Sequence, residues 1–184
     1  MMSNRVLVIS GPSGVGKGTV VREILSHHRN FQLSISATTR APRPGELDGR
    51  EYFFLSEEAF NAIVDSGEML EHAVVHGSKQ YGTPKQPVLT ALAAGNSVIL
   101  EIDVQGAMQV KKNMPECLTI FIAPPNMLQL ERRLAGRGTE SELEQQIRLA
   151  TAETEMRLAK NFDFQVINED VSKCAEEVVK LATS

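Results

Sequence analysis

Short runs of apolar residues alternate along the chain with segments whose apolar positions recur at helical spacing. The first run, 5–10, is rich in β-branched residues and is closed by Gly11 and Pro12, which is typical of a strand buried on both faces. Further strands are predicted at 32–36, 97–102, 118–122 and 164–167. Helices are predicted at about 19–28, 104–111, 126–134, 141–160 and beyond residue 167. The alternation predicts an α/β fold of three layers, in which helices cover both faces of a parallel sheet.

Residues 38–84 interrupt this alternation. The stretch 38–49 holds two prolines and two glycines, which predicts a loop. It is followed by a short strand at 51–55 and by a helix whose N-cap is Ser56. Two more short strands are predicted at 70–75 and around residues 80–81. We therefore expect one domain over residues 1–184, with a small mixed insert at about 38–84.

Composition fits a single cytoplasmic domain. The chain has 184 residues, of which 42% are hydrophobic, so it can form one sizeable core. We see no apolar run as long as a membrane span, and residues 1–4 are too short for a signal peptide. Cys117 and Cys174 are isolated in sequence, which favours buried thiols over a disulfide or a metal site.

Positive charge is concentrated in two places although the net charge is −4. An acidic protein lacks the broad basic surface that DNA or RNA requires, so no nucleic-acid partner is expected. Local arginine clusters suit a compact anion, and the alternative is two solvated faces. The clusters are Arg40, Arg43 and Arg50, and Arg132, Arg133 and Arg137.

The segment between the first strand and the first helix matches a phosphate-binding loop. Two glycines, Gly11 and Gly16, enclose four residues and are followed by Lys17. Glycines allow several backbone N–H groups to turn toward one phosphate, while the lysine and the helix N-terminus add positive charge. The predicted ATP-binding loop comprises Gly11, Pro12, Ser13, Gly14, Val15, Gly16, Lys17, Gly18 and Thr19.

One position departs from the general pattern of this loop. Gly18 stands where Ser or Thr usually coordinates Mg²⁺. Thr19 follows, as it does in loops of the adenylate kinase type, and could reach a phosphate or a magnesium-bound water. Mg²⁺ is therefore expected with ATP, and its direct protein ligand stays open.

Several further motifs resemble those of guanylate kinases and occur in that family's order over essentially the whole chain. The motifs are the segment 36–46 with Asp48, Gly49 and Tyr52, then Glu71, 81–83, 100–106, 122–125, 133–140 and 166–168. The resemblance implies a nucleoside monophosphate kinase of the P-loop class, with a GMP-binding insert and a short lid at about 134–150.

The resemblance also implies which residues bind GMP. Guanine presents N1–H and its 2-amino group side by side, and the carboxylate that matches Glu71 accepts both. The hydroxyls that match Ser36 and Thr83 suit the O6 acceptor. Forked cations and phenols suit the monophosphate, and the matching residues are Arg40, Arg43, Tyr52 and Tyr81.

The remaining candidates lie around the transferred phosphate and the ATP base. Glu101 and Asp103 end a predicted strand that faces the ligand crevice, where they could hold Mg²⁺ through water or contact the acceptor nucleotide. The alternative is a structural acidic pair. The resemblance places Arg133, Arg137 and Asn168 at ATP. It places Arg137 and Arg148 at the transferred phosphate, so that the implied catalytic set is Lys17, Arg40, Arg137 and Arg148.

The implied reaction is ATP plus GMP, and dGMP as a further acceptor, giving ADP and the diphosphate, a step in guanine nucleotide synthesis and recycling. Two alternatives stay open. A non-catalytic module of similar sequence could bind phosphorylated peptides, although such modules typically have degraded phosphate loops. A kinase for AMP or a pyrimidine nucleotide is disfavoured by Glu71 together with Thr83. The sequence assigns no oligomeric state.

Overall fold

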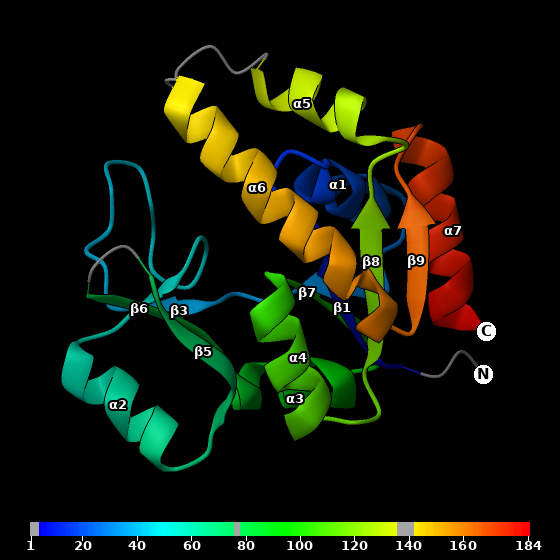
Figure 1. Ribbon diagram of the computed structural model, residues 1–184. Coiled ribbons are helices and arrows are strands. Elements are labelled where there is room, and N and C mark those ends of the chain that lie inside the picture. The colour runs from blue at the N-terminus through cyan, green and yellow to red at the C-terminus, as the bar shows by residue number, and fades with distance from the viewer. Residues whose placement is uncertain (1–3, 76–77, 136–141) are drawn as a thin grey trace.

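The structure is a computed structural model that describes residues 4–75, 78–135 and 142–184 (Figure 1). Its central sheet has five strands, and every neighbouring pair is parallel. In spatial order they are β2 (Phe31–Leu33), β7 (Ser97–Glu101), β1 (Val6–Ser10), β8 (Leu118–Ala123) and β9 (Phe164–Ile167). The predicted α/β fold with a parallel sheet is confirmed.

Side chains of the central strands alternate between two cores, because successive residues of a strand point to opposite faces. Leu7 and Ile9 of β1 belong to one core, and Val6 and Val8 belong to the other. All four are buried, so the sheet is covered on both sides. This explains why the central strands have continuous apolar sequences rather than alternating ones.

Seven helices and one 3₁₀ turn are present in the described residues. The helices around the central sheet are α1 (Lys17–His27), α3 (Lys85–Ala93), α4 (Val104–Asn113), α5 (Met127–Ala135), α6 (Glu142–Leu158) and α7 (Val171–Thr183), and the 3₁₀ turn is η1 (Ala159–Asn161). Helices α1 and α7 supply residues to the core of Leu7 and Ile9, whereas α3 and α4 supply residues to the opposite core.

Helix α3 was not predicted from the sequence. Pro84 is its N-cap residue and Pro87 lies in its first turn, so the prolines resemble a loop signal. Proline is compatible with the first helical turn, because the backbone N–H groups there have no intrahelical acceptor. The buried residues Val88 and Ala91 then anchor the helix on the sheet.

A second sheet is built from residues of the interrupted region. Its strand order is β4 (Phe53–Phe54), β3 (Ala37–Thr38), β6 (Lys79–Pro84) and β5 (Met69–Val75), with both parallel and antiparallel neighbours. Ser56 is the N-cap residue of helix α2 (Glu57–Asp65), as the sequence predicted, and its side chain accepts from the backbone N–H of Ala59. Phe60 and Met69 form the centre of a small separate core. The division of the chain into an insert and a lid stays a prediction.

Two strand predictions had the wrong bounds. The predicted strand at 32–36 is wrong as one element, because β2 ends at Leu33 in the central sheet and β3 begins at Ala37 in the second sheet. The chain therefore crosses from one sheet to the other at residues 34–36. The predicted strand at 51–55 is reduced to the two residues of β4.

Asp163 joins β8 to the segment that precedes β9. Its Oδ2 accepts from the backbone N–H of Thr119 at 2.8 Å, from the Thr119 hydroxyl at 2.8 Å and from Lys111 Nζ at 2.9 Å. Burial alone would raise the pKa of the Asp163 carboxyl, but the hydrogen bonds from Thr119 and Lys111 outweigh that effect and lower it. The carboxylate thus stabilises the folded state in its charged form.

We expect Asp163→Asn to lower the free energy of unfolding by about 1.5–3 kcal/mol at neutral pH, the range for hydrogen bonds to a charged group. Because the folded pKa is depressed, this stabilisation is present above the unfolded pKa of about 3.9 and is lost as pH falls through the folded pKa. Urea unfolding of both proteins between pH 7 and pH 2 measures it. Asp65→Asn, at an exposed position of α2, is the control, and an equal loss in both variants would contradict the assignment.

The described helices include none that is long and apolar enough to cross a membrane.

Both cysteines are buried free thiols, as predicted, and burial raises the pKa of each thiol to about 11. Such thiols are protonated at neutral pH and are therefore poor nucleophiles.

Candidate active site

The phosphate loop connects the end of β1 to the start of α1, as predicted. Gly16 has left-handed backbone angles and is the N-cap residue of α1. The loop lines a cavity of about 310 Å³ together with two charged residues, Arg22 of α1 and Glu101 of β7. The cavity opens at the carboxyl end of the parallel strands, where ligands of open α/β sheets bind.

Gly11 is required where the loop leaves the sheet. Its φ is +145°, and a Cβ atom at this position would lie 2.2 Å from the carbonyl oxygen of Ile122 in the neighbouring strand. No rotamer change can relieve a contact with the backbone of a central strand. The glycine therefore sets how closely the loop approaches β8.

We expect Gly11→Ala to lower the free energy of unfolding by about 3 kcal/mol or more, because overpacking adds to backbone strain. The matched control is Gly95→Ala, where φ is +92° and open space surrounds the added methyl group. That variant should lose only about 1 kcal/mol from strain alone. Urea unfolding compares them, and equal losses would show that the contact with Ile122 has no cost.

Lys17 lies over its own loop. Its Nζ donates to the carbonyl oxygen of Gly11 and, at 3.2 Å, to that of Pro12. Burial lowers the pKa of the Lys17 ammonium, and the negative charges of Glu155, Glu101 and Asp103 oppose that shift. The Lys17 ammonium therefore lies at the phosphate loop, within electrostatic range of these three carboxylates.

Arg133 and Asn168 hold the phosphate loop in place from two different elements. Nη1 of Arg133 on α5 and Nδ2 of Asn168 both donate to the carbonyl oxygen of Val15, at 3.0 Å and 2.9 Å. Nη2 of Arg133 also donates to the backbone oxygen of Asn168 at 3.0 Å. Both residues thus lie at the phosphate loop, and their contacts here are with the backbone of that loop. Direct contact with ATP stays a prediction.

Glu101 and Asp103 differ in their surroundings. Burial raises the pKa of the Glu101 carboxyl, while the charges of Lys17 and Arg22 lower it. A Cβ atom on Gly18 would lie 3.3 Å from Glu101 Oε1, so this carboxylate lies beside the position that usually carries the Mg²⁺-binding hydroxyl. Asp103 is the N-cap residue of α4 and accepts from the backbone N–H of Gly106 at 2.7 Å.

Arg40 lies just after β3 of the second sheet, and its guanidinium is held by Glu46. Its two terminal nitrogens each donate to a different carboxylate oxygen of Glu46, at 3.0 Å. The hydrogen bonds that Arg40 donates to Glu46 raise the pKa of the Arg40 guanidinium. The guanidinium carbon lies 5.5 Å from the ring centre of Tyr52, within range of a cation–π contact. Tyr81 packs edge-on against Tyr52, with 5.9 Å between the ring centres.

Arg43 belongs to the same loop, and its backbone N–H donates to Glu46 at 2.7 Å while its side chain is exposed. Glu46 therefore organises both predicted phosphate-binding arginines. Three of the four predicted monophosphate ligands, Arg40, Tyr52 and Tyr81, are brought together in one cluster.

Glu71 is a buried carboxylate, with 8% of the residue exposed. Its Oε1 accepts from the hydroxyl of Thr83 at 2.7 Å, so two residues predicted to read guanine are in direct contact. Burial raises the pKa of the Glu71 carboxyl, and the hydrogen bond from Thr83 opposes that shift. Ser36, Tyr52, Thr83 and Glu101 line a common cavity of about 140 Å³.

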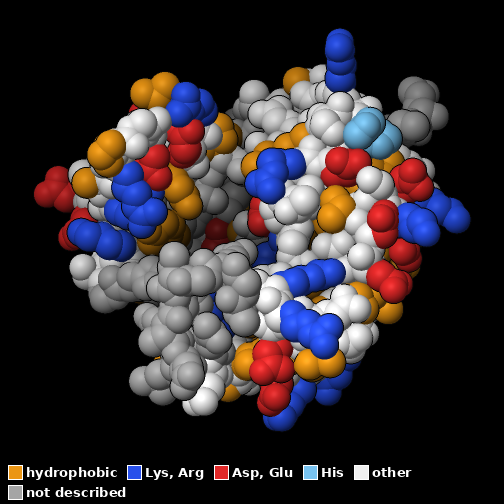
Figure 2. Space-filling model, turned by 90° about the horizontal axis from the view of Figure 1, so that it is seen from above, with side chains coloured by type: hydrophobic (Ala, Val, Ile, Leu, Met, Phe, Trp, Pro, Cys, Tyr) orange, Lys and Arg blue, Asp and Glu red, His pale blue; other side chains and the backbone are white. Residues whose placement is uncertain are grey.

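A hollow separates the second sheet from the central domain, and Lys and Arg side chains lie on both sides of it (Figure 2). Glu101 lines both the cavity of the phosphate loop and the cavity of Ser36 and Thr83. The two predicted nucleotide sites therefore adjoin at the end of β7. Of the predicted catalytic arginines on the lid side, Arg148 is half-buried on α6, and Arg137 lies outside the described residues.

Comparison with known proteins then identifies the family. The sequence profile of guanylate kinases matches residues 3–184. A guanylate kinase from Leifsonia xyli subsp. xyli is 50% identical over 176 residues, which are 96% of this chain and 69% of that protein. The chain belongs to the guanylate kinase family. A guanylate kinase from Prochlorococcus marinus is also 50% identical, over 93% of this chain and 91% of that protein.

Solved structures agree with this assignment. The crystal structure of guanylate kinase from Anaplasma phagocytophilum has a TM-score of 0.73 and 32% identity, and the match covers 98% of this chain and 85% of that chain. A shikimate kinase from Bacteroides thetaiotaomicron, at 14% identity and a TM-score of 0.52, shows similarity of fold alone. As a guanylate kinase family member, the chain is an ATP:GMP phosphotransferase.

Two carboxylates of the site were not identified from the sequence. Glu46 ends the segment 36–46 that contains Arg40 and Arg43, and an acidic residue inside a cationic cluster is a signal that could have been used. Glu155 lies on α6; burial raises the pKa of its carboxyl, and the charge of Lys17 opposes that shift. Its Oε2 is buried and has no hydrogen-bond partner among the described residues. Nothing in the sequence separates Glu155 from the other acidic residues of that helix.

Proposed function

We propose that this guanylate kinase family member transfers the terminal phosphate of ATP to GMP and to dGMP, and that it supplies guanine nucleotides for synthesis and recycling in the cytoplasm. The observation that carries the proposal is the shared wall at Glu101. A phosphate loop and a cavity lined by Ser36 and Thr83, two of the predicted guanine-reading residues, adjoin there, so a donor and an acceptor phosphate can meet without a covalent enzyme intermediate.

Charge and alignment, rather than a general base, supply the catalysis in this proposal. Phosphoryl transfer spreads negative charge over the moving group, and positioned cations stabilise it. Lys17 would act from the phosphate loop and Arg40 from the acceptor side. Arg137 and Arg148 would act from the lid side. Without a nucleotide, Glu46 accepts hydrogen bonds from both terminal nitrogens of Arg40. An incoming monophosphate would therefore share these donors with Glu46 or take its place.

The oxygen donors near the loop fit Mg²⁺, which would neutralise charge on the ATP phosphates when bound. Glu101 lies beside Gly18, and Thr19 and Asp103 are near the same loop, so hard oxygen ligands are available. Within the described residues no group of three or more His, Cys, Asp or Glu side chains is arranged to hold a metal. This suits Mg²⁺ held mainly by phosphate oxygens and water, with one or two protein contacts.

Acceptance of dGMP follows from which parts of the nucleotide are read. The predicted acceptor residues address the guanine base and the phosphate, and none is assigned to the ribose 2′-hydroxyl. We therefore propose that the site accepts dGMP as well as GMP, with ATP as the second small-molecule partner. The free buried thiols of Cys117 and Cys174 are compatible with a reducing cytoplasm.

A coupled ADP-release assay with a panel of monophosphates tests the proposal. GMP and dGMP should support turnover, whereas AMP, CMP and UMP should be poorer by several orders of magnitude, on the scale of roughly 10⁴–10⁵ that polar recognition achieves. Equal use of AMP would favour a kinase for another base. Binding of GMP without any ADP release would favour a non-catalytic module.

A further inference from the structure

Helix α4 presents two different faces. Its buried residues Val104, Ala107 and Val110 pack into the core of the central sheet. A second face carries Gly106, Gln109 and Asn113, spaced three and seven residues along the helix, so that they lie in one row. A glycine and two amides are an unusual choice for a face in contact with the protein, and each of the three meets β5.

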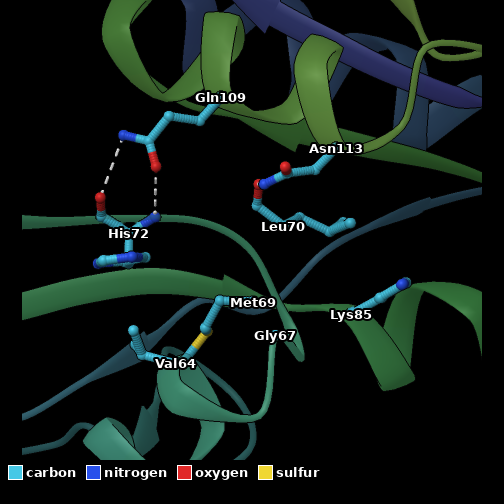
Figure 3. Close-up of a pocket in the computed structure, with 8 residues that line it drawn as sticks. All are labelled: Val64, Gly67, Met69, Leu70, His72, Lys85, Gln109 and Asn113. Carbon is cyan, nitrogen blue, oxygen red and sulfur yellow. Dashed lines mark hydrogen bonds between the residues drawn. The ribbon is translucent and has the colours of Figure 1, made fainter.

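The amides of this face bond to the free edge of β5. Gln109 accepts from the backbone N–H of His72 at 3.2 Å and donates to its carbonyl oxygen at 3.1 Å. Asn113 donates to the carbonyl oxygen of Leu70 at 2.9 Å. Figure 3 shows the paired bonds between Gln109 and His72, with Asn113 directed at Leu70. Because β5 is an edge strand of the second sheet, these side chains take the place of a neighbouring strand.

The spacing of the two elements makes this pairing possible. Four residues of helix separate Gln109 from Asn113, a rise of about 6 Å, and two residues of strand separate Leu70 from His72, about 6.6 Å. Beside the contact lies a cavity of about 290 Å³ that is lined in part by Val64, Lys85 and the same amides. Because the space beside the amides is open, no apolar packing there would compensate for the loss of their hydrogen bonds.

Glu71 lies between the two residues that α4 holds. A Cβ atom on Gly106 would lie 3.2 Å from Glu71 Oε2, so the glycine leaves room for the carboxylate against the helix. On its other side the carboxylate accepts from Thr83 of β6. The position of Glu71 is therefore determined by its own sheet and by the row of α4 residues.

We propose that Gln109 and Asn113 are positioning residues for guanine discrimination, which hold β5 against α4 so that the Glu71 carboxylate meets the base at a fixed distance and angle. The inference rests on the proposed function of Glu71. Asp103, the N-cap residue of α4, lies two residues after the end of β7 at Glu101, so the helix that holds the guanine carboxylate also starts at the phosphate-loop edge of the sheet. Neither amide touches the nucleotide in this proposal.

Gln109→Met tests it, because methionine keeps the length of the side chain and makes neither bond. We expect kcat/KM for GMP to fall about tenfold through KM, since displacement of a recognition group by a fraction of an ångström has effects of this size. The preference for GMP over IMP, which lacks the 2-amino donor, should fall by a similar factor. KM for ATP should change less than about twofold, because the phosphate loop is not displaced.

The control is Gln86→Met at an exposed position of α3, which should leave all these constants unchanged. Asn113→Leu removes one bond instead of two and should shift the GMP-to-IMP preference in the same direction by less. It also serves if Gln109→Met does not fold. An unchanged preference in folded variants of a wild type that prefers GMP would overturn the positioning role alone. A wild type that uses GMP and AMP equally would overturn the proposed function as well.

Discussion

Lys17→Met should reduce kcat by about 10³-fold or more while the protein stays folded. Removal of one preorganised donor to a developing anion costs roughly 10²–10³ in rate, and loss of a full charge at a phosphoryl group costs more. The side chain bonds only to Gly11 and Pro12 of its own loop in the described structure, so its removal opens no core cavity. Methionine retains the aliphatic length and removes the ammonium.

Steady-state GDP formation and thermal melting of the same samples measure the two effects separately. Lys173→Met, at an exposed position of α7, is the matched control and should keep both activity and Tm. Turnover close to that of wild type in a folded Lys17→Met protein would remove the phosphate loop from the mechanism. A fall in Tm of many degrees would instead mean that the lysine stabilises the loop.

The parts of the site that the sequence predicted are those determined by local order. The phosphate loop is one continuous segment between a strand and a helix, so its spacing alone indicates its geometry. Glu71 and Thr83 were paired through the family resemblance, and the antiparallel register of β5 and β6 places them opposite each other. Both strands were predicted, although β6 was expected only around residues 80–81 and extends over Lys79–Pro84.

The parts that escaped prediction depend on tertiary approach. Glu155 comes close to Lys17 only through the tertiary packing of α6, and no local signal on α6 indicates that approach. The chain leaves the central sheet between Leu33 and Ala37, where apolar and polar residues keep alternating without a turn signal. A window of sequence therefore shows one strand where the fold has two. Helix α3 was missed for a local reason. Its two prolines resemble a loop signal, although proline is compatible with a first helical turn.

Glu71→Gln should lower kcat/KM for GMP by roughly 10²-fold or more, the scale of hydrogen bonds to a charged group. Guanine offers two donors side by side, and a carboxylate offers an acceptor oxygen to each. Glutamine has one oxygen, so an amide N–H must face either a guanine donor or Thr83, which bonds to Glu71 at 2.7 Å in the present structure. KM for ATP at saturating GMP should change less, because Glu71 lies on the acceptor side.

The pH dependence gives an independent measure of the same residue. Burial raises the pKa of the Glu71 carboxyl, and the charged form is the one that accepts from both guanine donors. Efficiency with GMP should therefore be full above that raised pKa and should fall as pH drops through it. The Glu71→Gln variant should lack this acidic limb, since its amide does not titrate. A limb of unchanged position in the variant would assign it to another group.

Substrate comparison makes the test decisive. Wild type should prefer GMP to IMP, which keeps N1–H and O6 but lacks the 2-amino donor, and should reject AMP most strongly, because AMP leaves the buried carboxylate without donors. In Glu71→Gln the preference for GMP over IMP should shrink toward unity, because one of the two paired hydrogen bonds is already lost. The measurement is kcat/KM for GMP, dGMP, IMP and AMP with both proteins. If wild type used IMP as well as GMP, or if the variant kept the wild-type preference, guanine would be read by residues other than Glu71.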